Sequence, residues 1–299
     1  MNNYIDSFVA FIDILGFKNF ILKKNFEEVE NFFNTVNEVC NSLKSYNNEI
    51  FTKKMMDTVT INIISDSIII SVPKSTKLSL EILLILVDNI AFKILYSHNL
   101  LCRGAISEGN FYSNGNIAYG PAFVNAYMLE GNVAIYPRII FTRSVYDSYL
   151  KINSKNTVET LYDLMTLDEY SQLFFADYIK FSLNRMNNDS MYSVYYGIEA
   201  EKICDKIKRF IEDELASQTN PDIRKKYVYF KEYYNQVIKY FEDEYNGTIY
   251  KCEPIFNDNH KKSKTTQTEC HTENHCFDNN NINNSSNVAF GNGATVINK

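Results

Sequence analysis

The chain has 299 residues, a formal net charge of −6 and a hydrophobic fraction of 45%, which together predict a globular protein with one large core or two smaller ones. No basic stripe offsets the negative charge, so we expect no nucleic-acid partner. No apolar run reaches the roughly 18 residues of a membrane span, and the N-terminal MNNYIDS does not resemble a secretion signal. The six cysteines form no C-x-x-C pair and read as free thiols, so we expect a cytoplasmic protein.

Residues 8 to about 180 alternate between strand-like and helix-like patterns. Short runs of β-branched and apolar residues predict strands at residues 8–15, 58–65, 67–73, 100–109 and 136–142. Apolar residues spaced by three and four predict helices at residues 26–43, 79–98 and 120–131. The order β-α-β-β-α-β, with one further helix and strand, predicts an α+β fold with a ferredoxin-like core whose two middle strands form a hairpin.

Two further parts follow this core. Two amphipathic segments, residues 197–217 and 221–245, predict an antiparallel pair of helices. The residues after them are rich in Asn, Ser, Thr and Lys and predict a disordered tail, in which CHTENHC (270–276) lacks the usual spacing of a zinc site. We therefore expect a catalytic domain at 1–185, a helical region at 186–252 and a low-complexity tail at 253–299.

Two aspartates interrupt apolar strand sequences, Asp13 in FVAFIDILGF and Asp66 in IISDSIII. The predicted topology places the hairpin beside the first strand, so the two carboxylates converge and would repel each other unless a cation lies between them. Carboxylate oxygens are the ligands that Mg²⁺ and Mn²⁺ prefer. The alternative is that Asp13 only ends a strand and Asp66 only occupies a turn, where aspartate is common.

These motifs carry a resemblance to class III nucleotidyl cyclases. FIDILGF resembles the first metal motif of that family, ISDS is similar to the second, and RGAISEGNFY with YGPAFVNAYMLE resembles its strand, glycine turn and helix. The resemblance covers roughly residues 6–145. It implies a cyclase core with two ions of Mg²⁺ or Mn²⁺ per site, held by Asp13, Asp66 and the carbonyl of Ile14. It also implies a homodimer, because the family builds its site between two subunits.

Departures from the family pattern narrow the resemblance. Val124 and Met128 stand where adenylyl and guanylyl cyclases carry Asn and Arg, and no lysine precedes Asp66. The pattern looks like the pyrimidine cyclases of the Pycsar anti-phage system. This implies that CTP or UTP is converted to cyclic CMP or cyclic UMP, a second messenger that activates a separate effector.

The reaction requires the ribose 3′-oxygen to attack the α-phosphorus while pyrophosphate leaves, the usual setting for two-metal catalysis. Backbone N–H groups of LGFKN (15–19) would cradle the phosphates, with Gly16 allowing close approach, Phe17 within the turn and Lys18 adding charge. The other interpretation of Lys18 is a solvated surface residue.

Arg103 and Arg138 interrupt apolar runs, so each needs an anionic partner. That partner is either the reacting phosphate, in which case the arginine is catalytic, or a carboxylate such as Glu130 or Glu108. For base recognition the candidates are Asn62, with Thr58 and Thr60, on one face of the hairpin strand. They read equally as the solvent face of the sheet.

Two other functions stay open at this stage. A protein with this fold that binds nucleotides without cyclising them would tolerate the loss of the family's Asn and Arg. A partner-binding scaffold working through the helix pair and the tail would tolerate the loss of both aspartates.

Overall fold

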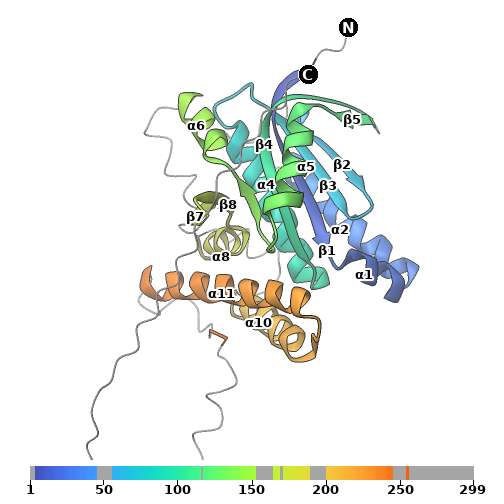
Figure 1. The fold of residues 1–299 in the computed structure, drawn as a ribbon, viewed down its shortest axis with the longest axis vertical. Coiled ribbons are helices and arrows are strands. Elements are labelled where there is room, and N and C mark those ends of the chain that lie inside the picture. Colours follow the sequence, from blue (N-terminus) through green and yellow to red (C-terminus); the bar gives the residue numbers. More distant parts are fainter. Residues whose placement is uncertain are drawn as a thin grey trace, which may run out of the picture. The chain divides into compact units, whose positions relative to one another are not determined.

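The computed structural model describes residues 4–45, 56–115, 117–152, 164–168, 171–188, 200–244 and 254–255. The described residues between 4 and 255 form one compact unit. Its centre is a mixed sheet with the strand order β2-β3-β1-β4-β6-β8-β7, and β5 pairs with β4 outside this path (Figure 1). The strands are β1 (Ile5–Leu15), β2 (Thr60–Ile64), β3 (Ser67–Pro73), β4 (Leu101–Asn114), β5 (Ile117–Tyr119), β6 (Ile139–Phe141), β7 (Met165–Asp168) and β8 (Leu173–Ala176).

The first four strands of the sheet confirm the predicted core. β1 lies between β3 and β4 and is antiparallel to both, and β2 is antiparallel to β3. This is the arrangement that a β-α-β-β-α-β chain reaches when its two middle strands form a hairpin. β6 extends the sheet by pairing parallel to β4, as expected for the appended helix and strand.

Helices cover both faces of the sheet and extend beyond it. They are α1 (Phe17–Lys23), α2 (Phe26–Ser45), α4 (Ser79–His98), α5 (Pro121–Val133), α6 (Arg143–Ile152), α8 (Tyr178–Asn188), α10 (Ala200–Ser217) and α11 (Pro221–Glu244). Most of α4 is buried, which explains why its sequence is apolar on nearly every side.

Alternation along β1 assigns its side chains to two cores. Phe8, Ala10 and Ile12 belong to the large core that contains α2 and α4, while Val9 and Phe11 belong to a smaller cluster under α5. Because successive side chains of a strand point to opposite faces, Asp13 lies on the α5 side, in line with Val9 and Phe11.

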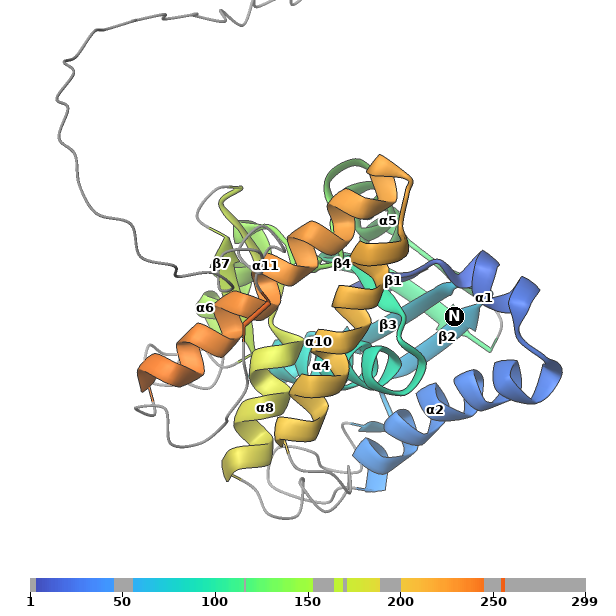
Figure 2. The ribbon, with the colours of Figure 1, turned by 90° about the horizontal axis from the view of Figure 1, so that it is seen from below.

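The predicted C-terminal helix pair is present. It packs against other helices of the chain and is not a separate appendage. α10 and α11 pack against each other, α10 also contacts α4, and both contact α8 (Figure 2). The hairpin β7–β8 with α8 was not expected from the sequence, because strands of four residues leave too little pattern. The predicted division at 185 and 252 stays a prediction, and the Cys/His motif lies, with all of the predicted tail except residues 254–255, outside the described residues.

The sequence predicts no membrane-spanning segment. None of the helices in the described ranges has both the length and the apolarity needed to cross a bilayer.

Candidate active site

Asp13 lies near the end of β1, between two neighbours fixed by strand register. It pairs across the sheet with Ser67 of β3 on one side and with Arg103 of β4 on the other. Its side chain is 21% exposed, so solvent reaches it from the end of the sheet. The long antiparallel β1–β4 ladder determines this position, because a slip of one residue would turn Asp13 to the opposite face.

Asp66 reaches the same end of the sheet through a tight turn. Ser65 and Asp66 form the two-residue connection between β2 and β3, and Ser65 adopts a φ of 56°. The backbone N–H of Ile14 donates to the carbonyl of Asp66 over 2.9 Å. The structure thus brings the two aspartates to adjacent backbone positions, as the topology predicted.

Arg103 joins Asp13 to Glu130 at this end of the sheet. Its Nε lies 3.0 Å from Oδ2 of Asp13 and 2.6 Å from Oε1 of Glu130 on α5. Glu130 is buried, which raises its carboxyl pKa, and the positive charge of Arg103 acts in the opposite direction. Of the two glutamates expected as partners, Glu130 pairs with Arg103, whereas Glu108 forms its ion pair with Lys74.

Arg138 has its backbone near this site and its side chain elsewhere. Its carbonyl accepts a hydrogen bond from the N–H of Gly104 over 3.1 Å, which places it beside β4. The guanidinium pairs with Asp168 at the end of β7, and its central carbon lies 5.5 Å from the ring centre of Tyr229 on α11. Asp168 was not among the partners that the sequence suggested.

The turn after β1 contains the three residues that we expected to bind phosphate, and their environments differ from one another. Gly16 adopts a φ of 81°, a left-handed conformation that favours glycine. The Phe17 side chain is buried against Phe20 and Phe32, so only its backbone faces the turn. Lys18 is exposed on α1.

Asn62, the candidate for base recognition, is bonded at both ends of its amide. Its Nδ2 donates to the carbonyl of Gly115 over 2.8 Å, and its Oδ1 accepts from the Ser113 hydroxyl over 3.2 Å. The nearby hydroxyls of Thr60 and Ser71 lie 2.7 Å apart. The two Asn62 contacts tie β2 to the end of β4 and the turn after it, and the amide keeps one further N–H and one further acceptor position for a base.

The donor atoms near Asp13 fit a hard divalent cation. Two carboxylates that solvent can reach, with a main-chain carbonyl beside them, supply the oxygen ligands that Mg²⁺ and Mn²⁺ prefer. Within the described residues Asp66 forms no ion pair, while Asp13 shares one oxygen with Arg103. No group of three or more His, Cys, Asp or Glu side chains gathers in that part of the chain. The protein would thus contribute two carboxylates, with water and phosphates completing the coordination.

Lys226 of α11 is a residue near this site that the sequence did not identify. Burial lowers its pKa, the positive charge of Arg103 lowers it further, and the negative charge of Asp13 opposes both. Its ammonium group therefore lies within electrostatic reach of the Asp13–Arg103 pair. On an amphipathic helix with several lysines, no sequence signal could have singled it out.

Comparison with known proteins gives no family match and no curated relative. Solved structures with similar outlines include a monomeric guanylyl cyclase domain of the RhoGC fusion protein from the aquatic fungus Blastocladiella emersonii (14% identity, 58% of this chain, 96% of that one, TM-score 0.41). Others are the adenylyl cyclase CyaB from P. aeruginosa (15%, 58%, 94%, 0.38) and the guanylate cyclase domain of RhGC from Catenaria anguillulae in complex with GTP (14%, 50%, 85%, 0.37).

Proposed function

We propose that this protein is a nucleotidyl cyclase that converts CTP or UTP to the 3′,5′-cyclic nucleotide and pyrophosphate. The observation that carries the proposal is the convergence of Asp13 on β1 with Asp66 in the turn before β3, where Arg103 pairs with Asp13. The resemblance of FIDILGF and ISDS to the metal motifs of class III cyclases supports the same assignment.

The reaction is an intramolecular phosphoryl transfer. The ribose 3′-oxygen forms a bond to the α-phosphorus, the bond from that phosphorus to the β-phosphate oxygen breaks, and the 3′-hydroxyl proton passes to solvent. Divalent cations, when bound, make the 3′-hydroxyl more acidic and neutralise charge on the departing pyrophosphate.

Each residue of the site has a role that follows from its position. Asp13 and Asp66 would hold the cations, with the carbonyl of Ile14 as a further ligand. Arg103 would stabilise the charge that develops on the α-phosphate, since its guanidinium lies beside Asp13, and Glu130 would orient it. The main-chain turn at Gly16 and Phe17, with Lys18, would contact the phosphates.

The homodimer and the pyrimidine base belong to the same proposal. Three apolar side chains of α5, Val124, Tyr127 and Met128, are each 52–54% exposed next to the site, which supports association of two copies over this face. Preference for CTP or UTP, a role in anti-phage defence and the separate effector rest on the resemblance to Pycsar cyclases.

The test is to incubate the purified full-length chain with each of the four NTPs and Mn²⁺ and to identify products by mass spectrometry. We expect a cyclic pyrimidine nucleotide from CTP or UTP. Asp13→Asn should form none, while Asp243→Asn, an exposed change on α11, should match the wild type. A purine product would overturn the substrate assignment, and no product from any NTP would overturn the activity.

One observation favours a second function, nucleotide binding without cyclisation. Val124 and Met128 replace the family's Asn and Arg, and Arg103 already pairs with two carboxylates of its own chain. If that function holds, CTP or UTP will bind in the presence of Mn²⁺ and remain unchanged in the same assay.

A further inference from the structure

A cavity of about 400 Å³ opens between the turn after β1 and the α10–α11 hairpin. Its walls include Leu15 and Gly16, which follow Asp13 by two and three residues, and Glu214, Ile223 and Lys226 of the hairpin. This volume is within the range of small-ligand sites, roughly 300–1,000 Å³. In Figure 1 the hairpin runs past the end of the sheet at which β1 ends. The cavity therefore adjoins the candidate metal site.

The cavity carries an excess of positive charge. Lys23, Lys24 and Lys226 line it, against one carboxylate, that of Glu214. Lys24 forms an ion pair with Glu28, and Glu214 is hydrogen-bonded to Tyr227. Lys23 and Lys226 form no ion pair with any carboxylate in the described ranges, so two ammonium groups are available to an anion.

Lys226 is the stronger candidate for binding an anion, because its side chain is half-buried. Partial burial of an ammonium group without a carboxylate partner is unfavourable, and an anionic ligand would offset that cost. Gly16 leaves the opposite wall open, since a Cβ atom built at this position would meet nothing within 4 Å.

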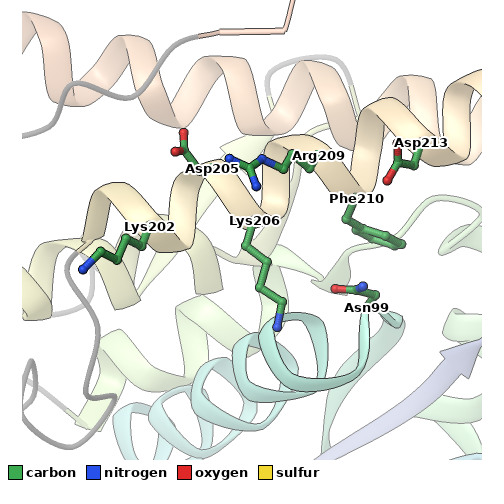
Figure 3. Close-up of a pocket in the computed structure, with 7 residues that line it drawn as sticks. All are labelled: Asn99, Lys202, Asp205, Lys206, Arg209, Phe210 and Asp213. Atoms are coloured by element: carbon green, nitrogen blue, oxygen red, sulfur yellow. The ribbon is translucent and has the colours of Figure 1, made fainter.

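A second pocket also contains several basic residues, but its central lysine is hydrogen-bonded to the backbone of its own chain. It has a volume of about 300 Å³ and includes Lys202, Lys206 and Arg209 of α10 (Figure 3). Lys206 donates to the carbonyl of Tyr96 in the last turn of α4 and lies 4.3 Å from the Tyr96 ring centre. Asp205 and Asp213 also line this pocket, so its charges are mixed. Its central lysine, Lys206, caps the end of α4.

We propose that the cavity between Gly16 and the α10–α11 hairpin binds the polyphosphate chain of the nucleoside triphosphate, with Lys226 as its principal cation. The inference rests on the proposed function, and it assigns a substrate-binding role to a helix outside the β-α-β-β-α-β core. Polyphosphate is the fitting ligand, because lysine binds phosphate as a point charge and the cavity starts beside the residues that would hold the cations. The hairpin then forms a wall of the active site.

The test measures binding of inorganic tripolyphosphate to the full-length chain by calorimetry, with Lys226→Ala, Lys226→Arg and Lys225→Ala beside the wild type. Lys226→Ala should weaken binding at least tenfold, and Lys226→Arg should retain most of it. Lys225→Ala is the matched control, because that neighbouring side chain is exposed and paired with Asp222, and it should change the affinity less than twofold. Thermal melting establishes that each variant is folded. Equal affinity in Lys226→Ala and the wild type overturns the proposal.

Two further measurements separate the sources of the phosphate and the two proposals. Tripolyphosphate should compete with CTP or UTP for one site; simultaneous binding of both would overturn the assignment to the substrate's own phosphates. If the wild type forms a cyclic product but Lys226→Ala binds tripolyphosphate as tightly as the wild type, this inference is refuted and the proposed function stands. Lys226-dependent binding without cyclisation of any NTP would refute the function and leave the anion site.

Discussion

The Nε atom of Arg103 lies 3.0 Å from Oδ2 of Asp13 on the strand beside it and 2.6 Å from Oε1 of Glu130 on α5. One guanidinium thus holds two carboxylates that belong to different layers of the fold. A cation arriving at Asp13 would share its carboxylate with this arginine, so the affinity for metal and the orientation of Arg103 are coupled.

The interaction between Arg103 and Glu130 can be measured through stability. Arg103→Met should lower the free energy of unfolding by about 2–3 kcal/mol, because it leaves Glu130 buried without a counter-charge. The double variant Arg103→Met, Glu130→Gln should recover at least half of that loss in urea unfolding. Additive losses in the double variant would mean that the two side chains do not interact.

Asp66→Asn should abolish turnover while the fold is kept. The substitution preserves the size of the turn residue and removes one negative charge, so cation binding weakens without a cavity. Thermal melting in the presence of a chelator should be unchanged or slightly higher, because repulsion with Asp13 is relieved. Cyclisation at the wild-type rate would exclude Asp66 from the metal site.

Arg138 should act on stability through Asp168. Its side chain is only 8% exposed, so Arg138→Ala should cost about 2–4 kcal/mol by leaving that carboxylate uncompensated. A mixture of Arg138→Ala with the inactive Asp13→Ala protein should be no more active than its Arg138→Ala component alone. Recovered activity in the mixture would instead place Arg138 in the site of a partner subunit.

Asp88 should make stability fall as pH rises. Burial, and then the charge of Asp177, raise its pKa well above the usual value, and neither carboxyl oxygen has a hydrogen-bond partner among the described residues. The folded state therefore binds a proton that the unfolded state releases above about pH 4, so this contribution is complete below that pH and declines above it. Asp88→Asn should melt higher than the wild type at pH 8, and the difference should be smaller at pH 5. A difference in melting temperature between Asp88→Asn and the wild type that does not change with pH would contradict this pH dependence.

His98 should have the opposite dependence. Burial lowers its pKa to about 4, and the ring lies against Phe32 and forms a hydrogen bond with the Thr35 hydroxyl. The unfolded state then binds the proton first, so stability should fall by about 1–2 kcal/mol between pH 6.5 and 4, allowing for solvent screening. In urea unfolding at pH 7.5 and 5, His98→Gln should be less stable overall and lose less on acidification. An equal loss in both proteins would assign the effect to other groups.

Local pattern alone determined much of this protein. The alternation of β1, the two-residue hairpin before β3 and the apolar length of α4 each follow from residues adjacent in sequence, and their order predicted the sheet. The convergence of Asp13 and Asp66 follows as well, because the ferredoxin-like arrangement of a β-α-β-β-α-β chain places its hairpin beside its first strand. The short strands β7 and β8 left no comparable signal.

Only the tertiary structure decided which charges meet. Arg103 and Asp13 are 90 positions apart in sequence, and Arg138 and Asp168 are 30 apart, so nothing local distinguishes these partners from Glu108. The position of Lys226 depends on how α11 packs against the rest of the chain, which amphipathic periodicity does not specify. Helical and strand patterns are set by neighbouring residues, whereas ion pairs and pockets depend on the packing of whole elements against one another.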